Sequence, residues 1–132
     1  MSAPLFPLRL ALFLLLAFSA CGSAMAATFY VRTDGGNASQ CTGRANTAYS
    51  GSGTGQACAW KHPYYALPAN GALRITGGDT LIIGAGEYMI GFGAPGASDV
   101  AGRCYSAGPY DCYLPPIPSG PSASLKTRIL GQ

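Results

Sequence analysis

A glycine-bounded stretch between Gly77 and Gly91 places the strictest limit on how this chain folds. It opens with a Gly-Gly-Asp turn, continues as an apolar run over residues 80–83, is interrupted at residues 84–86 and resumes over residues 87–90. Short runs of β-favouring residues between Gly and Asp are typical of strands. Because the interruption is too short for a helix, the stretch predicts two short strands joined by a tight turn. Such an arrangement is found in coils whose walls are formed by β-sheet.

The first residues have the pattern of an export signal. Arg9 precedes a continuous apolar run over residues 10–18, well short of the roughly 20 residues that span a bilayer. Ala24 and Ala26 follow in the A-x-A order that a leader peptidase accepts. We therefore predict a signal peptide at residues 1–26.

Cleavage at that point leaves one mature segment, residues 27–132. We expect it to be secreted or periplasmic, with no integral membrane span once the signal is removed. The rival interpretation is a lipoprotein anchored through Cys21, in which Phe18 stands where a lipid-attachment box usually has leucine.

Composition points to a loop-rich chain with a small core. It has 19 glycines and 10 prolines among 132 residues, near the edge of low-complexity composition. The formal net charge is +3, and the charged residues are scattered. Because they form no basic stripe, nucleic acid is not an expected partner.

Four cysteines remain after signal removal. An even number in an exported chain implies disulfides, and four cysteines allow three pairings. Proximity in the sequence favours Cys41 with Cys58 and Cys104 with Cys112. A metal site is disfavoured, because structural zinc needs closer ligand spacing and the chain has a single histidine.

Three further elements are expected along the mature chain. An aromatic and β-branched run predicts a strand over residues 28–32, and residues 34–37 predict the turn that ends it. Pro63 suits the first turn of a short helix, which Pro68 stops. Residues 126–131 predict a last strand, whose exposed edge suggests that the sequence is part of a longer protein.

Together these segments carry a resemblance to a known family. In order they are Phe29-Tyr30-Val31, Asp34-Gly35-Gly36, Ala59-Trp60-Lys61-His62-Pro63-Tyr64, Gly78-Asp79-Thr80-Leu81-Ile82-Ile83, Gly86-Glu87-Tyr88 and Thr127-Arg128-Ile129-Leu130-Gly131. The order resembles the N-terminal cap and first coils of secreted, pectate-lyase-like parallel β-helix proteins. The resemblance implies an all-β fold: the N-terminal portion of a right-handed single-stranded parallel β-helix with long disulfide-stapled loops and a short capping helix.

The same resemblance implies a function for the parent protein rather than for this piece. The family includes polysaccharide lyases, glycoside hydrolases, epimerases and proteins without known catalysis. Its calcium-binding acids and basic catalytic residue usually lie on later coils, so no catalytic residue and no cofactor are assigned to this chain, and calcium is expected only in a full-length parent. We expect a non-catalytic fragment of a protein that acts on polysaccharide by lyase chemistry; the alternative is a non-enzymatic envelope scaffold or adhesion module. No oligomeric state is predicted.

Candidate site residues are few. Aromatic rings beside polar groups suit sugar contact, and one loop carries both kinds: Arg103, Tyr105, Tyr110 and Asp111.

Other polar and apolar positions are expected to be structural. Asp79 should bond its own turn rather than calcium, and His62 should pack with Trp60 and Tyr64 rather than act as a general base. In a β-helix coil Leu81 and Ile83 should face inward, with Ile82 outward and Trp60, Tyr64 and Tyr65 in the cap.

Overall fold

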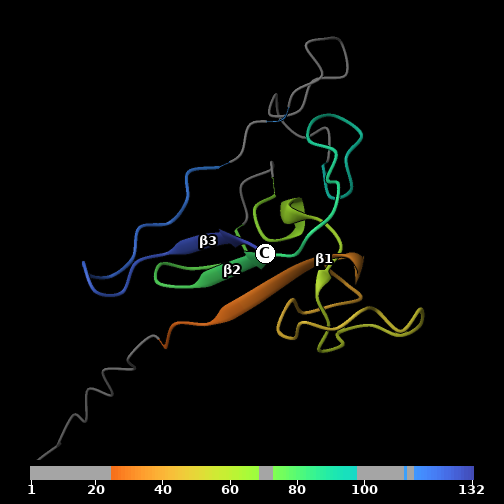
Figure 1. The fold of residues 1–132 in the computed structure, drawn as a ribbon, viewed down its shortest axis with the longest axis horizontal. Coiled ribbons are helices and arrows are strands. Elements are labelled where there is room, and N and C mark those ends of the chain that lie inside the picture. The colour runs from red at the N-terminus through yellow and green to blue at the C-terminus, as the bar shows by residue number, and fades with distance from the viewer. Residues whose placement is uncertain (1–24, 69–72, 98–111, 113–114) are drawn as a thin grey trace, which may run out of the picture.

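A small sheet with long loops makes up the described part of the chain. The computed structural model describes residues 25–68, 73–97, 112 and 115–132. They contain strand β1 (Thr28–Gly36), the 3-10 helix η1 (Pro63–Tyr65), strand β2 (Thr80–Ile83) and strand β3 (Arg128–Gly131), shown in Figure 1. The described part is therefore β-rich with almost no helix, as expected, and none of its helices is long and apolar enough to cross a membrane.

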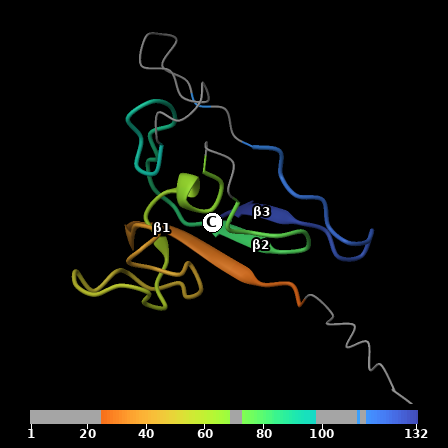
Figure 2. The same ribbon diagram turned by 180° about the vertical axis from the view of Figure 1, so that it is seen from behind.

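The three strands form one sheet in the order in which they occur along the chain. β1 pairs with β2, and β2 pairs with β3, in both cases parallel. Figures 1 and 2 show β2 between its two neighbours from both sides. Thr28 stands opposite Thr80, which in turn stands opposite Arg128. After β1 and again after β2, the chain therefore returns through a long connection to begin the adjacent strand in the same direction.

One column of apolar side chains crosses the sheet, buried on β1 and β2 and partly exposed on β3. Phe29, Leu81 and Ile129 stand opposite one another in register. Their exposed fractions are 6%, 0% and 40%. The inward position expected for Leu81 is confirmed, and Ile83 packs partly buried against the same core cluster, whereas half-buried Ile82 lies outside it.

The outer edge of β1 is covered by residues 41–61, which we call the cap segment. The amide of Tyr30 donates to the carbonyl of Gly43 (2.8 Å), and the amide of Gly36 donates to that of Ala59 (3.0 Å). These bonds satisfy backbone groups that an open strand edge would expose. The sheet consequently has one covered edge, at β1.

Trp60 joins the cap segment to the core. Its ring stacks on Phe29, with centroids 5.3 Å apart and planes 8° apart. Its indole Nε1 donates to the carbonyl of Cys41 over 2.7 Å. A disulfide between Cys41 and Cys58 closes the segment, which confirms the first predicted pairing. Cys112 is also disulfide-bonded, but its predicted partner, Cys104, lies outside the described residues.

β1 is longer than the sequence predicted, and residues 34–36 are strand rather than turn. A Cβ added to Gly35 would lie 2.4 Å from the carbonyl oxygen of Ala59, so this glycine permits close contact between backbones. The turn follows instead, where the side-chain oxygen of Asn37 accepts from the amides of Ser39 and Gln40, each over 3.0 Å.

The strand predicted over residues 87–90 is absent, and this expectation was wrong. Side chains of other segments bond the backbone here: the amide of Gly91 donates to the Tyr64 hydroxyl (3.1 Å), and the carbonyl of Met89 bonds His62 (2.9 Å). These side-chain bonds stand where a strand would form backbone hydrogen bonds to a neighbouring strand. The last strand is confirmed but begins at Arg128 rather than at Lys126.

Candidate functional site

A polar hollow lies where the three strands end. It encloses about 300 Å³. Its lining comes from the end of β1, from the cap segment and from the residues just after β2 and β3: Arg32, Thr33, Asp34, Asn46, Gly84, Ala85 and Gln132. In parallel sheets the carboxyl ends of the strands are a common place for ligands, so this polar hollow is the candidate functional site.

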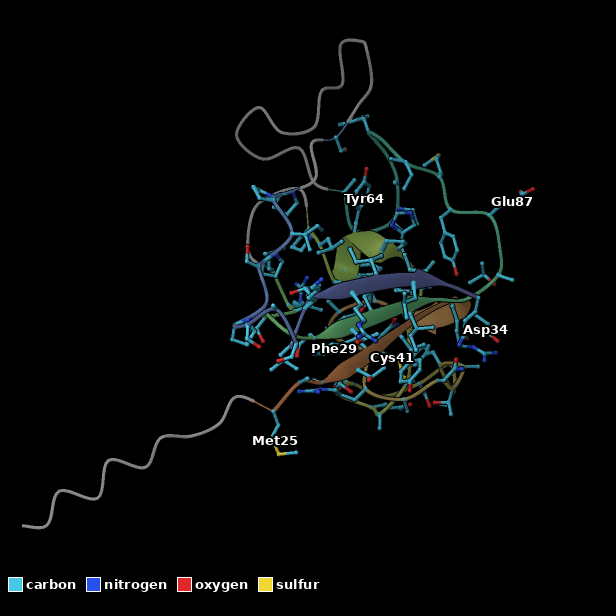
Figure 3. The ribbon with its side chains drawn as sticks, turned by 60° about the vertical axis from the view of Figure 1, so that its left-hand side comes forward. Met25, Phe29, Asp34, Cys41, Tyr64 and Glu87 are labelled. Atoms are coloured by element: carbon cyan, nitrogen blue, oxygen red, sulfur yellow. A yellow bond between two sulfur atoms is a disulfide. The ribbon has the colours of Figure 1, made fainter. Side chains whose placement is uncertain are left out.

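An arginine–carboxylate pair forms one wall of the polar hollow. Arg32 and Asp34 are two residues apart on β1, so their side chains leave the same face of the strand. Nε of Arg32 donates to Oδ1 of Asp34 (2.7 Å) and Nη2 donates to Oδ2 (2.8 Å). Figure 3 shows Asp34 at the end of the sheet opposite Met25. The pair is bidentate, and its fork geometry holds both groups in one plane.

The two charges stabilise each other while remaining accessible to solvent. The hydrogen bond between the two side chains lowers the pKa of Asp34 and raises the pKa of Arg32. The side chain of Asp34 is 52% exposed and that of Arg32 is 36% exposed. The pair therefore adds little to folding stability. Nη1 of Arg32 also reaches the side-chain oxygen of Asn46 over 3.4 Å. The polar hollow therefore presents donors and acceptors together.

A tyrosine lies beside the polar hollow. The hydroxyl of Tyr88 donates to the carbonyl of Gly84 over 2.9 Å. Burial raises the pKa of Tyr88, and the negative charge of Asp34 raises it further. An aromatic ring next to a charged fork and an amide is a set of groups that can stack on one face of a sugar and bond its hydroxyls.

His62 is structural, as predicted, although one neighbour differs. It is 2% exposed, and its ring lies against Tyr64 and Tyr88 rather than Trp60. Its Nδ1 accepts from the amide of Tyr64 (3.1 Å), which leaves Nε2 to donate to the carbonyl of Met89 (2.9 Å). Burial lowers its pKa, an effect that the bond to Met89 partly opposes. Both ring nitrogens are occupied, so His62 fits the role of an N-cap for η1 rather than of a base.

Asp79 bonds its own turn, as expected, and reaches the start of β1 as well. Its Oδ2 accepts from the amide and hydroxyl of Thr76 (2.7 and 3.0 Å), and its Oδ1 accepts from the amide of Ala27 (2.8 Å). Burial acts to raise its pKa, but the hydrogen bonds from Thr76 and Ala27 outweigh this effect, and the pKa lies below its ordinary value.

The described carboxylates do not fit a calcium site. Both oxygens of Asp79 accept hydrogen bonds from Ala27 and Thr76, and both oxygens of Asp34 accept from Arg32. Within the described ranges no three His, Cys, Asp or Glu side chains gather as metal ligands. We therefore derive no chemistry through calcium from these residues.

The structure does not test the residues predicted for carbohydrate contact. Arg103, Tyr105, Tyr110 and Asp111 all lie outside the described residues, so that prediction stays untested. Sequence reasoning missed the polar hollow, because it placed Arg32 at the end of the strand predicted over residues 28–32 and Asp34 in the turn after it. The two side chains share a strand face only because β1 continues to Gly36.

Comparisons with known proteins identify no relative. We found no matching family model, curated protein or solved structure. Any functional proposal for this chain therefore rests on its sheet, its cap segment and its polar hollow.

Proposed function

We propose that this chain forms the capped N-terminal part of a secreted right-handed parallel β-helix that acts on polysaccharide, and that this part binds sugar without catalysis. The observation that carries the proposal is the sheet: three successive strands lie side by side, parallel and in chain order. Stacked-coil proteins build their sheets in this way, since each coil adds one strand beside the last.

The difference between the two sheet edges supports the same proposal. The cap segment covers β1, whereas every residue of β3 is exposed, including Ile129 at 40% and Leu130 at 45%. Terminal units of stacked proteins need a cap on the outer side only. Another coil beside β3 would bury Ile129 as Leu81 is buried between its two neighbours.

The chemistry of the polar hollow supports a polyhydroxylated ligand. The Arg32–Asp34 fork and the Asn46 amide offer fixed donors and acceptors at the surface. Tyr88 lies next to them. Sugar hydroxyls both donate and accept hydrogen bonds, so they match a wall that contains both kinds of partner.

Affinity electrophoresis of the full chain through gels containing different polysaccharides tests the binding claim. We expect at least one acidic or neutral polysaccharide to retard the protein. Asp34→Asn should weaken the binding by at least about tenfold, since a hydrogen bond to a charged group contributes roughly 1.5–3 kcal/mol. Glu87→Gln removes the same charge from an exposed residue that does not line the polar hollow and should leave retardation unchanged. Equal retardation of the two variants, or none in any gel, would count against the proposal.

A non-enzymatic surface scaffold or adhesion module is the second candidate. The exposed apolar side chains of Ile129 and Leu130 favour it, because an open strand edge can pair with a strand of another chain. Ultraviolet absorbance of unsaturated uronides separates the candidates when a longer protein containing this chain is assayed on polyuronates. Product formation supports the polysaccharide-acting parent, and binding without product supports the scaffold.

A further inference from the structure

Ala27 is held at both ends of its backbone by the turn before β2. Its amide nitrogen donates to Oδ1 of Asp79 over 2.8 Å, and its carbonyl accepts from the amide of Thr80 over 2.8 Å. The two described residues before it are both exposed, Met25 by 88%. Among the described residues, the backbone bonds to the turn and to β2 thus begin at Ala27, directly after the Ala26–Ala27 bond where the sequence predicts leader cleavage.

Asp79 is a buried carboxylate whose hydrogen-bond donors are neutral in the uncleaved chain. It is 4% exposed, and its donors are the amides of Ala27 and Thr76 and the Thr76 hydroxyl. The charged group that acts on it is Arg44 of the cap segment, whose guanidinium lies 4.3 Å from the centre of the Phe29 ring. Burying a carboxylate is costly unless a cation or several hydrogen bonds compensate.

We propose that hydrolysis of the Ala26–Ala27 bond creates an α-ammonium group on Ala27 that forms an ion pair with Asp79, so that removal of the leader completes the fold. A peptidase with pockets for small side chains adds water to this bond. Ala26 leaves with the new carboxylate. The amine of Ala27 takes up a proton at neutral pH and already lies within ion-pair distance of Oδ1. This proposal rests on the predicted cleavage site and is independent of the sugar-binding proposal.

The ion pair predicts a bounded pH range of extra stability. The carboxylate contribution is present above the unfolded pKa of an aspartate, about 3.9, and is lost as the pH falls through the lower folded value. The ammonium contribution is present below the unfolded pKa of an α-amine, about 7.7–8.0, and is lost as the pH rises through the higher folded value. The other groups that face Asp79 are Arg44 of the cap segment, the amide and hydroxyl of Thr76, and Arg128 of β3, whose backbone amide donates to the carbonyl of Asp79.

The test begins with export of the full chain and determination of its first residue by intact mass and N-terminal sequencing. We expect Ala27. The exported protein is then labelled with an amine-acylating reagent across a pH series, in buffer and in guanidinium chloride, with Lys61 and Lys126 as internal references. An ion pair that raises the amine pKa by one unit lowers its reactive fraction tenfold, so labelling of the folded α-amine should be about tenfold slower than in guanidinium.

Three variants separate the ion pair from other causes. Asp79→Asn, and insertion of one serine between Ala26 and Ala27, should each restore fast labelling. The insertion keeps the Ala27 amide bond to Asp79 but moves the charge away, so it remains informative if Asp79→Asn fails to fold. Glu87→Gln removes an exposed carboxylate and should change nothing. A first residue other than Ala27, equal labelling in folded and denatured protein, or equal effects of Glu87→Gln and Asp79→Asn would overturn the proposal.

Discussion

The cap segment is most sharply tested by adding one methyl group at Gly43. This glycine has φ of +73°, and a Cβ placed on it would lie 2.7–2.8 Å from three atoms of the Trp60 ring. Gly43→Ala therefore imposes two costs: a left-handed backbone conformation on alanine and a collision with the indole.

The second cost is large because the indole cannot move aside. Trp60 is 2% exposed, is stacked on Phe29 and is bonded through Nε1 to the carbonyl of Cys41. Overpacking a fixed core site costs about 1–3 kcal/mol. The left-handed conformation adds about 1–2 kcal/mol for any residue with a Cβ. We expect Gly43→Ala to lower the free energy of unfolding by about 2–5 kcal/mol.

Gly55→Ala is the matched control. Gly55 lies in the same disulfide-closed segment with φ of +63°, and a Cβ there meets no atom within 4 Å. It carries the backbone cost alone, so the difference between the two variants measures the collision with Trp60. Urea denaturation gives both values, and each kcal/mol should correspond to a melting-temperature shift of roughly 4–8 °C. Equal destabilisation by the two variants would refute the account of a fixed indole.

Three further predictions concern the core and its cross-link. Replacing Cys41 and Cys58 together by serine should cost about 3 kcal/mol in urea denaturation, because a disulfide closing a loop of about 15 residues is worth that much. Because burial lowers the pKa of His62, its imidazole binds a proton more readily in the unfolded chain than in the folded one. The free energy of unfolding should therefore decline as the pH falls below about 6.5, the unfolded pKa of a histidine. His62→Gln should remove this part of the pH profile. Leu81→Ala should cost about 2–5 kcal/mol and the half-exposed Ile129→Ala much less, by the same measurement; similar losses would contradict the burial gradient across the sheet.

The parts of this fold that were predictable depend on local signals. The run over residues 80–83 is bounded by glycine on one side and by a Gly-Gly-Asp turn on the other, and β2 has those limits. Cys41 and Cys58 were paired correctly because a short closed loop is favoured by proximity. In each case residues close in sequence were enough to predict the strand limits or the cysteine pairing.

The parts that were missed depend on contacts between distant segments. The glycines at positions 35 and 36 look like a turn, but Gly35 permits a close approach to Ala59 and Trp60, and Gly36 permits one to Cys41 and Gln40. The run over residues 87–90 looks like a strand, but His62 bonds the carbonyl of Met89 within it, and Tyr64 bonds the amide of Gly91 just after it. The polar hollow was missed for the same reason, because its walls come from four separate places in the chain.

The covered edge at β1 also limits how copies of this chain can associate. If two molecules met through β3, each would present its cap segment outward, and a two-fold axis would relate them. In such a pair both edges of the described sheet would be covered, so it would stop as a discrete dimer instead of elongating into a fibre. One covered and one exposed edge in the described sheet thus favour a discrete dimer over a fibre.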